Sequence, residues 1–171
     1  MMYLNVVNFA QTTGTLGTPA MRGFEMLTTA VYRQSSRTPG YIAHAEPVDH
    51  RDDLSFFHRD WGPWGPFSVP HYYKGGFNAG EVVEASALSV WRDLSSLRAF
   101  VYEGLHARAM SKKDLWFTPM EFPGYALWWS PVFPTWKEAS NKLELIHRIG
   151  TSSAAFTFSS LHDENGQPIR S

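Results

Sequence analysis

The stretch "EVVEASALSVW", Glu81 to Trp91, carries the alternation that decides the fold of this 171-residue chain. Successive side chains of a β-strand point to opposite faces of its sheet. One face receives the large residues Leu88 and Val90, and the other receives Ala85, Ala87, Ser89 and Trp91. Because three of these four are small, the pattern predicts a strand with free space over one face.

Three further segments have the short, β-branched and aromatic character of strands: "MYLNVVNFA" (2–10), "GYIAHAEP" (40–47) and "GYALWWSPV" (124–132). Between the first two, Phe24, Leu27 and Val31 form one apolar stripe of a helix that we expect to open at Thr18 and Pro19. Helices are also expected on either side of Gly104 and from Thr135 to Gly150, where T-x-x-E forms a capping box.

The resulting order is strand, helix, strand, loop, strand, helix, strand, helix, which is the split βαβ pattern of a ferredoxin-like α+β domain. We expect one such domain over residues 1–160, with an inserted lid-like loop at 48–80 and a solvated tail at 161–171. Helices would cover one sheet face only. The bare face, with its alanines and tryptophans, predicts a homodimer that closes an α+β barrel.

Several segments of the chain resemble a known family. In order, "LSVWRDLSSLRAFVYEGLHARAM", "YALWWSP", "PTWKEASNKLELI" and "AFTF", together with "VNFA" and "TPGYI" near the N-terminus, resemble the domain of unknown function 3291 family. That family is a member of the dimeric α+β barrel superfamily. The resemblance implies the barrel fold and a pocket between sheet and helices, but no activity.

The superfamily contains cofactor-independent antibiotic-biosynthesis monooxygenases, isomerases and haem-binding enzymes. In the haem-degrading members, an Asn on the first strand, an aromatic residue and a His on the helix after the third strand line the pocket. Asn8 and Phe100 match the first two, whereas Met110 stands at the position of the haem histidine and His106 lies one turn earlier. The resemblance therefore makes haem an alternative, and no cofactor is the leading expectation.

Composition excludes other classes of function. The formal charge is −1 and lysines and arginines are scattered, which argues against a nucleic-acid partner. No cysteine is present, so thiolate metal sites and a cysteine nucleophile are excluded. The N-terminus has neither a signal-peptide pattern nor a long apolar run, so no membrane association and a cytoplasmic protein are expected.

The loop "HRDWGPWGPFSVPHYY", His58 to Tyr73, concentrates rings among prolines and glycines. We predict that it folds as a lid over the cavity, with Trp61, Trp64 and Phe67 inserted and with His71, Tyr72 and Tyr73 supplying polar contacts. A loop packed as a satellite core is the alternative. The histidines and acids of this region have no known ligand spacing, so no metal site is predicted.

The candidate catalytic residues are His106 or His71 as general base and Asn8 as a hydrogen-bond donor to a developing oxyanion. Arg108 is expected to hold an anionic substrate group. His44 and Glu46, on one strand face, are either an acid/base pair or two imidazole and carboxylate ligands, and a solvated edge-strand pair is the alternative. The cavity wall is expected to include three further tryptophans, Trp91, Trp116 and Trp128.

These features predict a small-molecule enzyme of metabolism that acts on an aromatic or polycyclic substrate, by cofactor-independent oxygenation or by proton transfer as in an isomerase, cyclase or dehydratase. Two alternatives stay open. One is a haem-binding oxidoreductase or dehydratase of the same fold, and the other is a non-catalytic ligand-binding or interaction dimer.

Overall fold

The computed structural model describes residues 1–50, 56–73 and 84–170. Its strands are β1 (Tyr3–Gln11), β2 (Tyr41–His44), β3 (Glu84–Trp91) and β4 (Tyr125–Ser130). Its helices are α1 (Arg22–Ser35), α2 (Leu94–Tyr102), α3 (Gly104–Met110), α4 (Lys113–Trp116) and α5 (Trp136–Ile149), with short 3-10 turns η1 (Phe56–His58) and η2 (Gly62–Trp64).

The strands form one sheet in the order β2-β3-β1-β4, and each neighbouring pair is antiparallel. Asn8 at the centre of β1 pairs with Ala87 of β3 on one side and with Tyr125 of β4 on the other. This strand order follows from a split βαβ connectivity, so the predicted α+β class and ferredoxin-like arrangement are confirmed.

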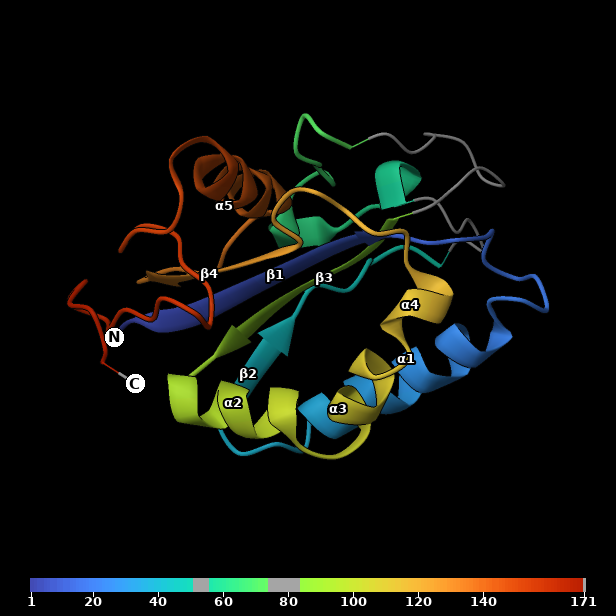
Figure 1. The fold of residues 1–171 in the computed structure, drawn as a ribbon, viewed down its shortest axis with the longest axis horizontal. Helices are drawn as coiled ribbons and strands as arrows, with labels where there is room; N and C mark the ends of the chain where they lie inside the picture. The colour runs from blue at the N-terminus through green and yellow to red at the C-terminus, as the bar shows by residue number, and fades with distance from the viewer. Residues whose placement is uncertain (51–55, 74–83, 171) are drawn as a thin grey trace.

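One face of the sheet is covered by α1, α2 and α3, as Figure 1 shows. The buried side chains there include Leu4, Trp91 and Leu127. A glycine at the start of α3 allows the helical layer to close, because Gly104 has a φ of +65° and a β-carbon there would lie 2.6 Å from Nε2 of Gln34 in α1. The Gln34 amide in turn accepts a hydrogen bond from the backbone N–H of Leu105 at 2.9 Å.

The opposite face is covered by α5 and by the segment 56–73 (Figure 1). The rings of this segment pack with Trp136 of α5 into a ring cluster, made of Phe56, Trp61, Trp64, Phe67, Tyr72 and Trp136. Trp61 and Phe67 lie 5.0 and 4.9 Å from Trp136, measured between ring centroids and in edge-to-face geometry. Such pairs add to the stability that burial of the rings already provides.

The ring cluster corrects two expectations. The predicted lid is wrong in its position, because Trp61, Trp64 and Phe67 are buried in the core beneath α5. The prediction of a bare sheet face is also wrong, because within the described residues elements of the same chain cover both faces of the sheet. The apolar patch that motivated the homodimer is therefore not exposed here, and the homodimer stays a prediction without that support.

The ends of several elements also differ from expectation. Helix α1 begins at Arg22 rather than Pro19, since residues 18–21 form turns. The sequence "AAFTFSS" (154–160), rich in small, β-branched and aromatic residues, would also suit a strand, but the structure has none there, and Phe156 makes an isolated bridge to β4. The predicted solvated tail is anchored at its start, where Leu161 is buried and the His162 carbonyl accepts a hydrogen bond from Nε1 of Trp129 at 2.9 Å. No helix in the described ranges has the length and apolar character needed to cross a bilayer.

Replacement of Trp61 by Ala tests the structural role of the ring cluster. The Trp61 ring is 5 % exposed and its Nε1 donates to the Phe56 carbonyl at 2.9 Å. Truncation of a buried tryptophan removes packing and leaves a cavity, so the free energy of unfolding should fall by about 3–5 kcal/mol in urea denaturation. The control Leu115→Ala, at a residue 69 % exposed, should change it by less than about 0.5 kcal/mol. A loss below about 1 kcal/mol for Trp61→Ala would show that the ring is not part of the core.

Candidate functional site

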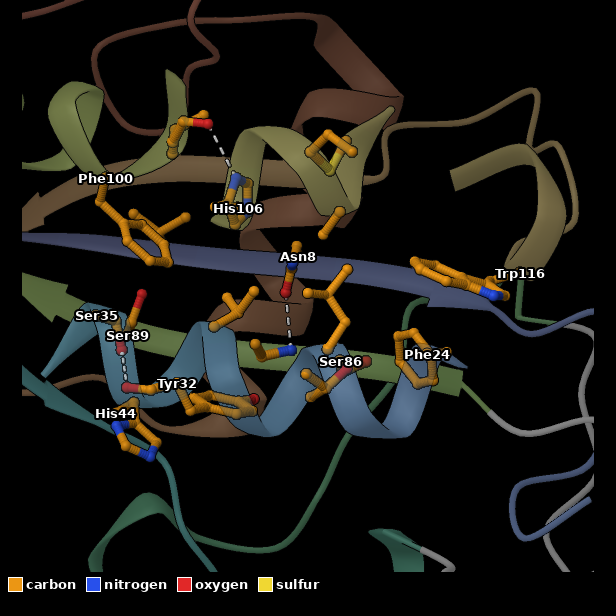
Figure 2. Close-up of a pocket in the computed structure, with 18 of the residues that line it drawn as sticks. Asn8, Phe24, Tyr32, Ser35, His44, Ser86, Ser89, Phe100, His106 and Trp116 are labelled. Atoms are coloured by element: carbon orange, nitrogen blue, oxygen red, sulfur yellow. Dashed lines mark hydrogen bonds between the residues drawn. The ribbon is translucent and has the colours of Figure 1, made fainter. Parts of the chain in front are cut away.

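A cavity of about 520 Å³ lies between the sheet and the helical layer. Its floor is formed by β1 and β3, and its walls by α1 and by the segments from α2 to α4, as Figure 2 shows. The small residues of β3 that the sequence singled out, Ala87 and Ser89, line the floor. The predicted space over this face of the strand is therefore present, and most of its lining is apolar.

His106 of α3 projects into the cavity next to Phe100 (Figure 2). Its Nδ1 lies 3.0 Å from the Val101 carbonyl oxygen, which can only accept a hydrogen bond, so the imidazole carries its proton on Nδ1. Burial lowers the pKa of His106 and outweighs the opposite effect of the Val101 hydrogen bond. The ring is therefore neutral at pH 7, and Nε2 is left as a proton acceptor.

Asn8 lies across the cavity from His106, on the central strand β1 (Figure 2). Its side-chain oxygen accepts a hydrogen bond from the backbone N–H of Ala87 at 2.9 Å. This contact fixes which way the amide points, because the oxygen must face β3. The Nδ2 group remains as a donor to a molecule in the cavity.

A chain of polar side chains leads from the cavity to the surface at the β2 edge. The His44 ring stacks on Tyr32 of α1 at 4.7 Å, and its Nε2 contacts the exposed Glu46 carboxylate at 2.7 Å. The other ring nitrogen of His44 bonds the Tyr41 hydroxyl. Burial, followed by the charge of Glu46 and by Tyr41, raises the pKa of Tyr32 to about 12, so its phenol stays a donor at the cavity wall.

The electrostatic character of the cavity argues against haem. A haem group carries two propionates, which need cationic partners or water. The described lining contains no Lys or Arg, and its one carboxylate, Glu25, would repel them. His106 and Met110 both line the cavity, so axial ligands exist, but the residues around them do not fit the rest of the group.

The structure brings five of the predicted site residues to this cavity: Asn8, His44, Trp91, His106 and Trp116. The pairing of His44 with Glu46 is present. In a regular strand, Ile42 and His44 would share one face of the sheet, but here they do not. The register between β2 and β3 shifts between Tyr41 and Ala43, so Ile42 packs against the ring cluster while His44 lines the cavity.

The other predicted site residues lie elsewhere. Arg108 is on the exposed surface of α3 and is not part of the lining, so it cannot hold a substrate group inside the cavity. His71 pairs with Glu144 of α5 on the other side of the sheet. The remaining six lie on that opposite face, five in its core (Trp61, Trp64, Phe67, Tyr72 and Trp128) and Tyr73 packed against them.

Several lining residues were not predicted as site residues. Tyr32, Ser35 and Phe24 come from α1, whose apolar stripe suggested only packing against the sheet. Ser86 of β3 lines the cavity as well, and its buried hydroxyl has no hydrogen-bond partner within the described ranges. The small side chains of β3 could have indicated the residues of α1, because residues that lie opposite small side chains line the space that these leave.

Comparison with known proteins places the chain in a family. Among solved structures, SnoaB, a cofactor-independent oxygenase from Streptomyces nogalater, is 14 % identical, with 79 % of this chain and 97 % of that chain covered and a TM-score of 0.42. A putative antibiotic biosynthesis monooxygenase from Nitrosomonas europaea is 14 % identical, with 78 % and 93 % covered and a TM-score of 0.43. No curated protein matches the chain. The model of the domain of unknown function family DUF3291 matches residues 3–170, and the chain therefore belongs to that family.

Proposed function

We propose that this protein is a small-molecule enzyme in which Nε2 of His106 removes a proton from an acidic C–H or O–H group of an aromatic substrate. One observation carries the proposal: a neutral imidazole, held through Nδ1 by the Val101 carbonyl, faces an apolar cavity across which Asn8 presents an amide donor. A general base and an oxyanion donor on opposite sides of a cavity are the two groups that proton abstraction next to a carbonyl requires.

The proton and the electron pair are accounted for within the cavity. The proton passes from the substrate carbon to Nε2 of His106, and the electron pair moves onto the adjacent carbonyl oxygen to give an enolate or phenolate. Nδ2 of Asn8 donates to that oxygen, and the Tyr32 phenol is a further donor in the lining. Because the walls are apolar, each of these hydrogen bonds is stronger than it would be in water.

Two outcomes follow from such an anion. If the proton returns from His106 to another carbon, the reaction is an isomerisation. If dioxygen accepts the electrons, a C–O bond forms, the resulting peroxide takes up the proton, and loss of water leaves a new carbonyl group. In that case a CH₂ group and O₂ become a C=O group and water without a bound cofactor.

The lining defines the substrate class. The rings of Phe24, Phe100 and Trp116 offer faces and edges for a flat apolar molecule. A volume of about 520 Å³ lies within the range of about 300–1,000 Å³ that is usual for small-molecule sites. Since the described lining carries Glu25 and no cationic residue, the substrate is expected to be neutral in its resting form.

Replacement of His106 by Gln tests the base. With fused-ring phenols and enolisable ketones in D₂O, the wild-type protein should catalyse deuterium exchange that is detectable by NMR, or oxygen uptake at an electrode. His106→Gln should lower the rate by about 10²–10⁴-fold. The control His50→Gln changes an exposed histidine outside the cavity and should leave the rate unchanged. Binding of these compounds with neither exchange nor oxygen uptake would identify a non-catalytic binding protein.

Replacement of Asn8 by Ala tests the oxyanion donor. Loss of one such donor should reduce kcat by about 10²–10³-fold while the KM changes little, because the hydrogen bond strengthens only as charge develops on the substrate oxygen. The control Asn165→Ala lies in an exposed turn distant in sequence from every lining residue. A rise in KM at constant kcat would instead assign Asn8 to ground-state binding.

The pH dependence of the rate follows from the lowered pKa of His106. The base must be neutral, so kcat/KM should be constant near pH 7 and should fall as the pH drops through the pKa of His106. Since burial is the larger effect, this fall should be centred below the ordinary histidine value of about 6.5. A rate that begins to fall above pH 7 would contradict the assignment, and the acid-side fall should be absent from the residual rate of His106→Gln.

A further inference from the structure

A second group of chemically active side chains lies on the opposite side of the sheet from the cavity, between α5 and the segment 56–73. His71 comes from that segment, whereas Glu144 and His147 come from α5. One ligand atom from each residue lies within 4.8 Å of the other two. We propose that these three residues form a binding site for a divalent transition-metal cation of the zinc type.

The helix supplies two of the ligands by its geometry. Residues three apart lie on the same face of an α-helix, so Glu144 and His147 project side by side from the last two turns of α5. The partial negative charge at the C-terminal end of a helix favours a cation there. Glu144 and His147 therefore lie near the C-terminal end of α5, where the helix dipole also attracts a metal ion.

His71 is already held against this pair. The backbone N–H of His71 donates to one oxygen of Glu144, and its Nδ1 lies 2.6 Å from the other oxygen. A neutral imidazole carries its proton on either nitrogen. If the proton moves to Nε2, Nδ1 becomes a ligand atom next to the carboxylate, and the metal takes the place of the shared proton.

His147 is oriented by rings rather than by hydrogen bonds. The centroids of Phe122, His71 and Tyr72 lie 4.6, 5.0 and 5.1 Å from its own. The Tyr72 hydroxyl donates to the Pro123 carbonyl at 2.9 Å, which fixes this neighbour in turn. Within the described residues, neither ring nitrogen of His147 has a hydrogen-bond partner, so a ligand atom is available without the loss of an existing bond.

The ligand set identifies the class of metal. Two imidazoles and one carboxylate are a combination that zinc binds, with a fourth position left to water. Calcium and magnesium prefer sites made of oxygen ligands alone, so they should bind weakly here. A bound ion would tie the segment to α5 and so stabilise the ring cluster.

Zinc titration of the full chain, freed of any histidine tag and stripped with a chelator, tests this site. Calorimetry with zinc chloride should give one ion per chain, and zinc should raise the Tm because it binds the folded state. The variants Glu144→Gln and His147→Ala each remove one ligand group. Each should lower the affinity for zinc by at least about tenfold and abolish the rise in Tm. The control His50→Ala, at an exposed histidine outside the group, should bind zinc as the wild type does.

A further variant and a second metal ion test the same site. If His147→Ala fails to fold, His71→Ala replaces it, since the His71 side chain is 63 % exposed and contributes little to the core. Cobalt(II) in place of zinc should give the visible absorption of a tetrahedral site with nitrogen and oxygen ligands. Absence of stoichiometric zinc binding, equal affinity in wild type and variants, or full competition by excess calcium would each overturn the site.

Discussion

The alternation of small and large side chains along β3 is the constraint on which the rest of the structure depends. Leu88 and Val90 point to one side and pack beneath α5 and the ring cluster, while Ala87 and Ser89 point to the other and leave room under α1. A sheet with equally large residues on both faces would be closely packed on both. Ala87 lies opposite Asn8 and Ser89 lies opposite Val6 of β1, so the space opens at the centre of the sheet.

The two sides of the sheet therefore have different roles, since one side forms a closely packed core and the other forms the cavity. On the side of the ring cluster, Trp61, Phe67 and Trp136 bury large areas and supply stability. On the cavity side, the packing is less complete, and the buried hydroxyl of Ser86 has no hydrogen-bond partner within the described ranges. A buried hydroxyl without a partner lowers stability, so its presence is better explained by function than by folding.

The local parts of this account could be predicted from the sequence. The faces of β3 follow from a period of two, and Thr135 caps α5 as expected, since its hydroxyl oxygen accepts from the Glu138 N–H at 3.2 Å. Long-range choices could not be predicted. The rings of residues 58–73 suit a lid and a core equally well, and the pairing of His71 with Glu144 spans 73 positions. The irregular register that turns His44 toward the cavity depends on how β2 meets β3.

The chemistry proposed for the cavity depends on which nitrogen of His106 carries the proton, because Nε2 can act as a base only when the proton is on Nδ1. Nitrogen-15 NMR of the histidine side chains distinguishes a proton on Nδ1, a proton on Nε2 and the doubly protonated ring. For His106 at pH 7, we expect the neutral form with its proton on Nδ1, where the Val101 carbonyl accepts a hydrogen bond at 3.0 Å. A proton on Nε2 at that pH, or a doubly protonated ring, would contradict the account.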